Sequence, residues 1–247
     1  MTTQNKQKWY SFVPSFFTSM NLVCGVIATY LSFEGKINIA LALMIIAALF
    51  DFIDGFVARL LKVSGDFGKE LDSLADVISF GFVPGAMLFY IQKSHIQDFH
   101  LGAELSFLQW IILLSTVLIP VFSSLRLAKF NIDERQKSEF IGLPTPANAL
   151  FIAALSYTFV YQPEHWLSTL NNPLIIVAVI VVFSFLLVSE IPLFALKFKS
   201  FSLKGNAIRY IFIVLACFVL ILFKIPGLSL VIVLYIVTSI ITKLFKA

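Results

Sequence analysis

Charged residues are scarce in this chain. Asp, Glu, Lys and Arg make up only 13% of its 247 residues, whereas a soluble domain carries about a quarter. Cysteine is scarce too: Cys24 and Cys217 do not have the spacing of a metal or redox motif, and we interpret them as packing residues. The sequence also lacks internal repeats, low-complexity tracts and long linkers. It therefore predicts a single domain that is not a soluble one.

In place of charge, the chain has 59% hydrophobic residues, arranged in runs of about 20, the length that crosses the hydrocarbon core of a bilayer. Spans in lipid must satisfy their own backbone hydrogen bonds, so these runs predict helices, and the alternation typical of a membrane barrel is absent from the sequence. The predicted fold class is an all-α polytopic membrane protein. Eight spans are expected, near residues 12–33, 37–61, 70–92, 106–128, 144–161, 172–195, 207–223 and 226–242.

The basic residues indicate an orientation for these spans. If the N-terminus is cytoplasmic and all eight spans cross, 15 of the 18 Lys and Arg residues lie on the cytoplasmic side and 3 on the other. This asymmetry follows the positive-inside rule and predicts that both termini are cytoplasmic. The net charge of +4 is explained by the same bias, so no nucleic-acid partner is expected.

Six of the 14 acidic residues fall within 26 positions, between residues 51 and 76. A helix advances about 100° per residue, which puts Asp51 and Asp54 on one face of the second span. The same spacing puts Asp72 and Asp76 on one face of the third, antiparallel span, so the two faces can converge near the cytoplasmic side. The other two acids lie in or beside the loop, off the shared face, and are left out of the site: Asp66 and Glu70.

Four carboxylates that meet repel one another unless a cation intervenes. Oxygen ligands without His or Cys suit a hard divalent ion, Mg²⁺ or Mn²⁺, and four aspartates can hold two ions that clamp phosphate oxygens. Three small residues on these faces, Gly55, Ala58 and Gly68, leave room for a ligand near the backbone, while Arg59 supplies a positive charge for phosphate. One aspartate near a helix end is often only a cap, but four at these phases predict a metal site.

Residues 51–76 read as D-x-x-D-G-x-x-A-R, eight residues, then G-x-x-x-D-x-x-x-D. This pattern resembles, without a substitution, the motif of the CDP-alcohol phosphatidyltransferase family. The resemblance implies a membrane enzyme that uses divalent metals to transfer a phosphatidyl group from a CDP-linked lipid to an alcohol, releasing CMP. It also implies a six-helix catalytic core, here 12–195, and suggests a homodimer. The two spans at 207–242 are additional to that core.

The resemblance assigns roles to the matching positions. It makes Asp76 the candidate general base that deprotonates the acceptor hydroxyl. The aspartates would be metal ligands, and the small residues and the arginine would contact the cytidine nucleotide and the phosphates: Asp51, Asp54, Asp72 and Asp76 for the metal, and Gly55, Ala58, Gly68 and Arg59 for the nucleotide and phosphates.

Three further stretches resemble the phosphatidylserine synthase branch of the family, which implies CDP-diacylglycerol as donor and L-serine as acceptor: PSFFTSMNLVCG at 14–25, SLRLAKFN at 124–131 and FIGLPTPANA at 140–149. Asn21 is a candidate nucleotide contact, although a hydrogen bond between helices explains it nearly as well. Arg126 is a candidate for binding the serine carboxylate or a phosphate. The alternative is that it lies near the cytoplasmic end of its span only because of the positive-inside rule. Asn131 is a candidate contact for the acceptor, and the alternative is that it only caps the end of a helix.

Two alternatives stay open. A different acceptor, such as glycerol phosphate, inositol phosphate or choline, would keep the chemistry and change only the product. A carboxylate-based ion transporter is the second alternative, but it favours acids near the bilayer midplane and paired repeats, and the sequence has neither feature. The expected location is a prokaryotic cytoplasmic membrane, with the active site on the cytoplasmic side.

Overall fold

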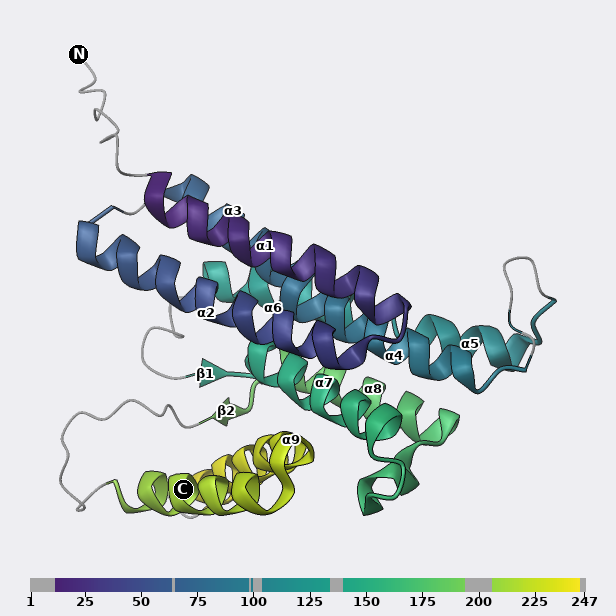
Figure 1. Ribbon diagram of the computed structural model, residues 1–247. Coiled ribbons are helices and arrows are strands. Elements are labelled where there is room, and N and C mark those ends of the chain that lie inside the picture. The colour runs from purple at the N-terminus through teal and green to yellow at the C-terminus, as the bar shows by residue number, and fades with distance from the viewer. Residues whose placement is uncertain are drawn as a thin grey trace.

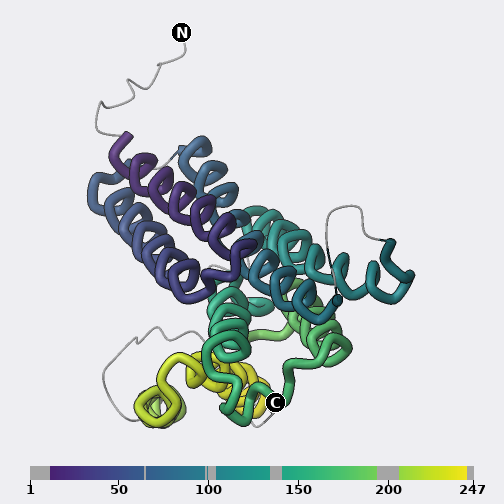
Figure 2. Tube along the Cα trace, turned by 45° about the vertical axis from the view of Figure 1, so that its right-hand side comes forward, coloured from purple at the N-terminus to yellow at the C-terminus, as the bar shows by residue number. Residues whose placement is uncertain are grey.

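The computed structural model describes residues 12–63, 65–97, 99, 104–133, 140–193 and 206–244. It begins with two antiparallel helices that lie side by side, α1 (Phe12–Phe33) and α2 (Ile37–Leu61) (Figures 1 and 2). Their bounds coincide with the first two predicted runs. The tight turn between them uses Gly35 at φ +74°, a conformation that glycine adopts without steric cost. α2 ends where Lys62 takes a left-handed conformation and its N–H bonds back to Arg59 O.

The third helical segment is continuous but changes its winding part-way. It consists of α3 (Asp66–Val77), the π-helical turn η2 (Ile78–Phe82) and α4 (Val83–Ser94). The segment thus begins four residues before the predicted 70–92 run and ends two residues after it. A π turn inside an α-helix inserts an extra residue and re-aims the side chains that follow, and such turns are frequent at functional sites. Here the turn begins two residues after Asp76.

The fourth predicted run is divided into two helices, α5 (Phe107–Ser115) and α6 (Leu118–Ile132). α5 begins with a capping box, in which the Ser106 hydroxyl accepts from the Gln109 N–H and the Gln109 side chain accepts from the Ser106 N–H. α6 contains Pro120 in its first turn, where the missing N–H costs no intrahelical bond.

The fifth and sixth runs form α7 (Thr145–Tyr161) and α8 (Pro173–Val188), with the 3₁₀ turn η4 (Trp166–Leu170) between them. The prediction of helix up to residue 195 is wrong at its end. Strand β2 (Pro192–Leu193) instead pairs antiparallel with β1 (Phe140–Ile141). The Gly142 N–H also donates to Ile191 O at 2.9 Å. These hydrogen bonds satisfy backbone groups of the extended chain, and a continued helix would break them.

The last helix, α9 (Ala207–Leu244), is interrupted at Lys224, whose φ of 53° and ψ of −127° are not helical. Pro226 follows two residues later and has no N–H to continue the hydrogen-bond ladder. The interruption falls between the predicted runs 207–223 and 226–242. α9 lies against the side of α7 that is remote from α1 and α2 (Figure 1).

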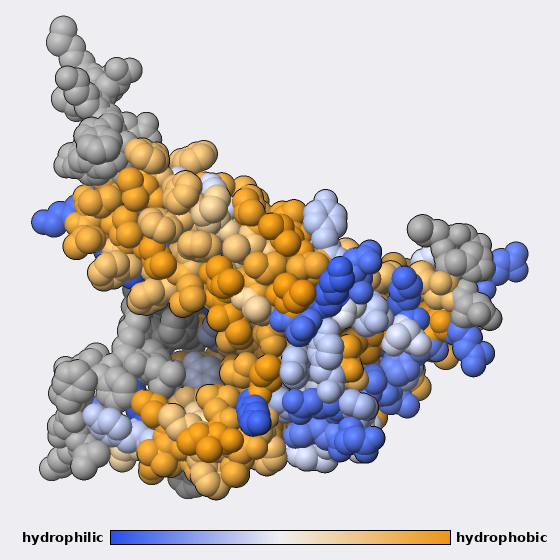
Figure 3. Space-filling view, viewed as in Figure 1, coloured by the Kyte–Doolittle hydropathy of each residue, from blue (hydrophilic) through white to orange (hydrophobic). Residues whose placement is uncertain are grey.

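α7 occupies the middle of the protein and joins two apolar clusters. Ala149 and Ala153 pack with residues of α1, α2 and α4, whereas Ile152 and Leu155 pack with residues of α6, α8 and α9. Five described helical segments are long and apolar enough to cross a membrane: 12–33, 37–61, 66–94, 107–132 and 207–243. Hydrophobic side chains cover the visible faces of α1, α2 and α9, while hydrophilic ones gather around the C-terminal end of α7 (Figure 3). The chain is an integral membrane protein of the all-α class, with one short strand pair beside its helices.

Candidate active site

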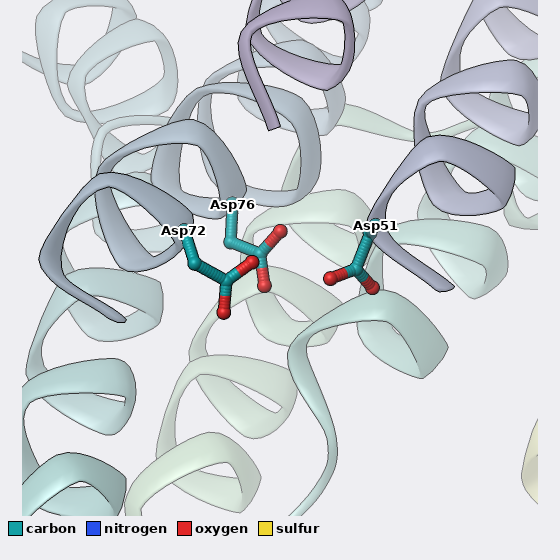
Figure 4. Close-up of side chains that lie close together, drawn as sticks. All are labelled: Asp51, Asp72 and Asp76. Carbon is teal, nitrogen blue, oxygen red and sulfur yellow. The ribbon is translucent and has the colours of Figure 1, made fainter. Parts of the chain in front are cut away.

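Three of the four predicted aspartates converge between α2 and α3. Asp51 projects from α2 toward Asp72 and Asp76 of α3, and the carboxylates face one another (Figure 4). One carboxylate oxygen from each lies within 4.8 Å of the others. Asp72 and Asp76 are one turn apart, so the helical period brings both to the face that meets α2. The convergence predicted from sequence is therefore present for these three residues.

Asp54, the fourth aspartate, lies one turn after Asp51 and is buried. Its Oδ2 accepts a hydrogen bond of 2.6 Å from the Thr18 hydroxyl of α1. The three-residue carboxylate group does not include it. One oxygen of Asp54 is thus committed to a neighbouring helix, and its role as a metal ligand stays a prediction.

Asn21 contacts an aspartate through its side chain. Its Nδ2 donates to Asp76 Oδ1 at 3.1 Å, and the residue is fully buried. Ser79, on the same side of the third segment, donates to the backbone oxygen of Asn21 at 3.1 Å. The hydrogen bond between helices, one of the two interpretations of Asn21, is observed, and it orients the Asp76 carboxylate. A nucleotide contact of Asn21 stays a prediction.

The small residues of the motif border open space. A Cβ added to Gly68 would meet no atom within 4 Å, and one added to Gly55 would meet only the guanidinium of Arg59, at 3.4 Å. Ala58 is half-buried and Arg59 is exposed, one residue apart on α2. The backbones of α2 and α3 are therefore accessible to a ligand beside the aspartates, and Arg59 adds a positive charge there.

Arg126 of α6 is only 7% exposed although it carries a charge. Its Nη1 donates to the Thr145 hydroxyl of α7 at 3.0 Å, and its guanidinium lies 5.5 Å from the ring centre of Phe130. It is also within electrostatic range of Asp76. Placement by the positive-inside rule does not by itself account for an arginine that is buried and bonded to the neighbouring helix α7.

Asn131 bonds to residues of α3 other than the aspartates. Its Nδ2 donates to the Ser73 hydroxyl at 2.8 Å, and its backbone oxygen accepts from Lys69 Nζ at 2.7 Å. These bonds tie the end of α6 to α3. Acceptor binding by Asn131 stays a prediction. Asp66 and Glu70 are exposed on α3, in agreement with their exclusion from the site.

The sequence profile of the CDP-alcohol phosphatidyltransferase family matches residues 11–244 of this chain. The chain belongs to this family. The match to the phosphatidyltransferase profile includes α9, although neither arm of that helix carries a motif residue.

Curated relatives of this phosphatidyltransferase carry serine in their names. The CDP-diacylglycerol–serine O-phosphatidyltransferase of Bacillus subtilis (strain 168) is 30% identical over 181 residues, which are 73% of this chain and 89% of that protein. The protein of the same name from Helicobacter pylori (strain ATCC 700392 / 26695) is 30% identical over 236 residues, 94% and 91% of the two chains. The archaetidylserine synthase of Methanothermobacter thermautotrophicus is 36% identical over 163 residues, 64% of each chain.

CDP-alcohol phosphatidyltransferases depend on divalent metals in general, and the carboxylate group fits such an ion. Its donors are all oxygen, which hard cations prefer. Asp72 Oδ1 is moreover buried without a hydrogen-bond partner among the described residues. A buried carboxylate oxygen in that state is costly unless a cation or another donor meets it.

Sequence reasoning missed Thr18 and gave Asn21 only a divided interpretation. A signal was available: the buried residues of α1 are Thr18, Asn21, Gly25, Ala28 and Ser32, spaced alternately by three and four. That spacing defines one helix face, and all five residues are small or polar. Such a face in an apolar helix indicates close helix packing with hydrogen bonds across it.

Proposed function

We propose that this protein transfers the phosphatidyl group of CDP-diacylglycerol to the hydroxyl of L-serine, giving phosphatidylserine and CMP. The observation that carries the proposal is the convergence of Asp51, Asp72 and Asp76 at the positions of the family motif. The choice of serine is supported by the names of the relatives, two of which align with about nine-tenths of their own length.

The metal site we propose holds Mg²⁺ or Mn²⁺, two ions in all, through Asp51, Asp54, Asp72 and Asp76. When bound, these ions neutralise the pyrophosphate of the CDP-lipid and the charge that develops on its oxygens during transfer. The arrangement is supported by the shared carboxylate face and by the free oxygen of Asp72.

The other steps are assigned to side chains of the protein. Asp76 accepts the proton of the serine hydroxyl while the new O–P bond forms and the P–O bond to CMP breaks. Asn21 holds the Asp76 carboxylate in one orientation. Gly68 and Ala58 leave room for the nucleotide, and Arg59 binds a phosphate through its guanidinium.

The membrane arrangement we propose has eight spans, with α3, η2 and α4 forming one, α5 and α6 forming another, and α9 forming two. Both termini then lie in the cytoplasm of a prokaryotic cell, and the site opens on the cytoplasmic face of its membrane, as the distribution of Lys and Arg supports. Residues 12–195 form the catalytic six-helix core. The arms of α9 are additional and bond to this core through Ser229, whose hydroxyl donates to Phe151 O at 3.1 Å. A homodimer is the expected assembly, and light scattering of the purified protein in detergent would test it.

The test of the proposed function is transfer of radiolabelled L-serine into lipid by the purified protein, with CMP measured in parallel. We expect both products to depend on CDP-diacylglycerol, to vanish with EDTA, and to return on titration with Mg²⁺ or Mn²⁺. CMP release that requires glycerol 3-phosphate and ignores L-serine would contradict the assignment.

A matched pair of variants tests the choice of carboxylates. Asp72→Asn removes a ligand of the proposed ion, and we expect it to abolish transfer. Asp66→Asn removes an exposed acid from the first turn of the same helix, and we expect it to keep transfer. Equal loss in both would mean that general negative charge near α3, and not a defined metal site, is required.

A further inference from the structure

A second group of buried polar side chains, on α6 and α7, has side-chain atoms without hydrogen-bond partners among the described residues. It comprises Ser123 and Arg126 of α6 and Asn148 of α7, which are 0%, 7% and 0% exposed. Among the described residues, the Ser123 hydroxyl and Arg126 Nε have no hydrogen-bond partner, and both amide atoms of Asn148 lack one. The aspartate motif includes none of the three, although Arg126 and Asn148 lie in the stretches 124–131 and 140–149 that resemble the serine branch.

Asn148 is the most unusual member of this group. Its amide offers two donors on Nδ2 and two acceptor sites on Oδ1, and none of them is used within the described residues. Buried polar side chains in native proteins nearly always find at least one partner, because an unmet group retains its full desolvation cost. A molecule that both donates and accepts hydrogen bonds is therefore the expected neighbour of Asn148.

The three residues come from α6 and α7, which both pack against η2, the turn that begins two residues after Asp76. The bond from Arg126 to Thr145 joins these helices, and Asn148 follows Thr145 by three residues, so the two are neighbours on the surface of α7. Arg126 is within electrostatic range of Asp76. Ser123 packs against η2: a Cβ on Gly81 would lie 3.1 Å from Ser123 Cβ.

The chemistry of the group favours a zwitterion over a simple anion. The guanidinium of Arg126 has only donors and suits a carboxylate. Asn148 Nδ2 adds a further donor, but Asn148 Oδ1 needs a donor from the ligand. A phosphodiester anion has no such donor, whereas the ammonium group of a free amino acid has three.

We propose that Asn148, together with Arg126 and Ser123, binds the α-amino and α-carboxylate groups of the amino-acid acceptor, so that Asn148 determines specificity for serine. The inference rests on the proposed function and extends it to a residue and a contact. The acceptor would then present its hydroxyl toward Asp76 while its charged end is held between α6 and α7.

The test compares the steady-state kinetics of Asn148→Ala and the similarly sized Asn148→Leu with those of the wild-type protein. Losing hydrogen bonds to a charged group raises the KM for L-serine by about 10- to 100-fold, and we expect the KM for CDP-diacylglycerol to stay the same. Ser156→Ala is the matched control. Ser156 of α7 is also fully buried, and its hydroxyl has no partner among the described residues. It lies about two helical turns beyond Asn148, so we expect the Ser156→Ala variant to keep the wild-type KM values. Thermal unfolding in detergent identifies the variants that are folded.

A second measurement tests which ligand group is recognised and can use either folded variant. 3-Hydroxypropanoate has the hydroxyl and the carboxylate of serine but lacks the amino group. With the wild-type protein, it should compete with radiolabelled L-serine far more weakly than unlabelled L-serine does. In an Asn148 variant the difference in affinity between serine and 3-hydroxypropanoate should shrink by the same factor as the KM rises.

The outcomes separate this inference from the proposed function. If the wild-type protein transfers to serine and the Asn148 variants keep its KM, or lose affinity for both substrates equally, the inference alone is wrong. If Asn148→Leu and Ser156→Ala behave alike, the unpartnered amide meets only water. If the wild-type protein does not transfer to serine, both proposals fail together.

Discussion

Replacing Asn21 by alanine isolates the orientation of the proposed base. Asn21 Nδ2 donates to Asp76 Oδ1 at 3.1 Å, in a position with no solvent exposure. Alanine removes this donor, keeps the helix, and leaves the Asp76 carboxylate one hydrogen bond short. Asn21 itself is fully buried, so the bond is lost inside the helix packing and the carboxylate can rotate away from its bonded orientation.

The size of the effect follows from the strength of the bond. A hydrogen bond to a charged group contributes about 1.5–3 kcal/mol, and 1.36 kcal/mol in an activation barrier is a factor of ten in rate. If the bond acts on the base during proton transfer, Asn21→Ala lowers kcat by roughly 10- to 100-fold. The KM for the CDP-lipid should change little, because the side-chain bond of Asn21 is made to the proposed base.

The assay is CMP release at saturating L-serine, with CDP-diacylglycerol varied. Ser32→Ala is the control, since Ser32 lies on the same buried face of α1 and donates only to Ala28 O within its own helix. A wild-type kcat in Asn21→Ala would refute the orienting role. A raised KM for the CDP-lipid at unchanged kcat would restore Asn21 as a nucleotide contact.

Three other predictions address the site. Asp76→Asn should abolish turnover while CDP-lipid binding, measured by calorimetry, persists; normal turnover would remove Asp76 as the base. Ala58→Leu should raise the KM for the CDP-lipid about tenfold or more, because side-chain bulk enters the space beside the motif; an unchanged KM would show that the nucleotide binds elsewhere. Thr18→Val removes the 2.6 Å bond to Asp54 at nearly constant volume, and outer contacts of this kind change metal affinity by about 10- to 100-fold. The Mg²⁺ concentration for half-maximal activity should therefore rise, and an unchanged value would indicate that Asp54 binds no ion.

The carboxylate face could be predicted because it depends on a local rule. Residues three and four apart on a helix share a face, and Asp51, Asp72 and Asp76 do converge. The partners of Asp54 and Asp76 could not be predicted in the same way. Thr18 and Asn21 precede them by 36 and 55 positions, and only the packing of α1 decides which carboxylate each one meets.

The errors in predicting the fold from the sequence have a similar cause. Residues 189–195 are as apolar as many helix ends, so the pattern favoured continuation of α8. The chain instead leaves the helix because Pro192–Leu193 pair with Phe140–Ile141, about 50 positions earlier. The π turn η2 gives no periodic signal either, since a single inserted residue within a hydrophobic run leaves the composition unchanged.

α1 sets the position of the two acidic helices relative to each other. Thr18 bonds to α2 and Asn21 bonds to α3, from positions three residues apart on one face. One turn further along, a Cβ on Gly25 would lie 3.0 Å from Ser79 Cα, so only glycine allows this close approach to η2. A helix without a single carboxylate thus fixes both the spacing of α2 and α3 and the orientation of Asp76. Because divalent ions demand defined ligand positions, the small and polar face of α1 is as much a part of the site as the aspartates.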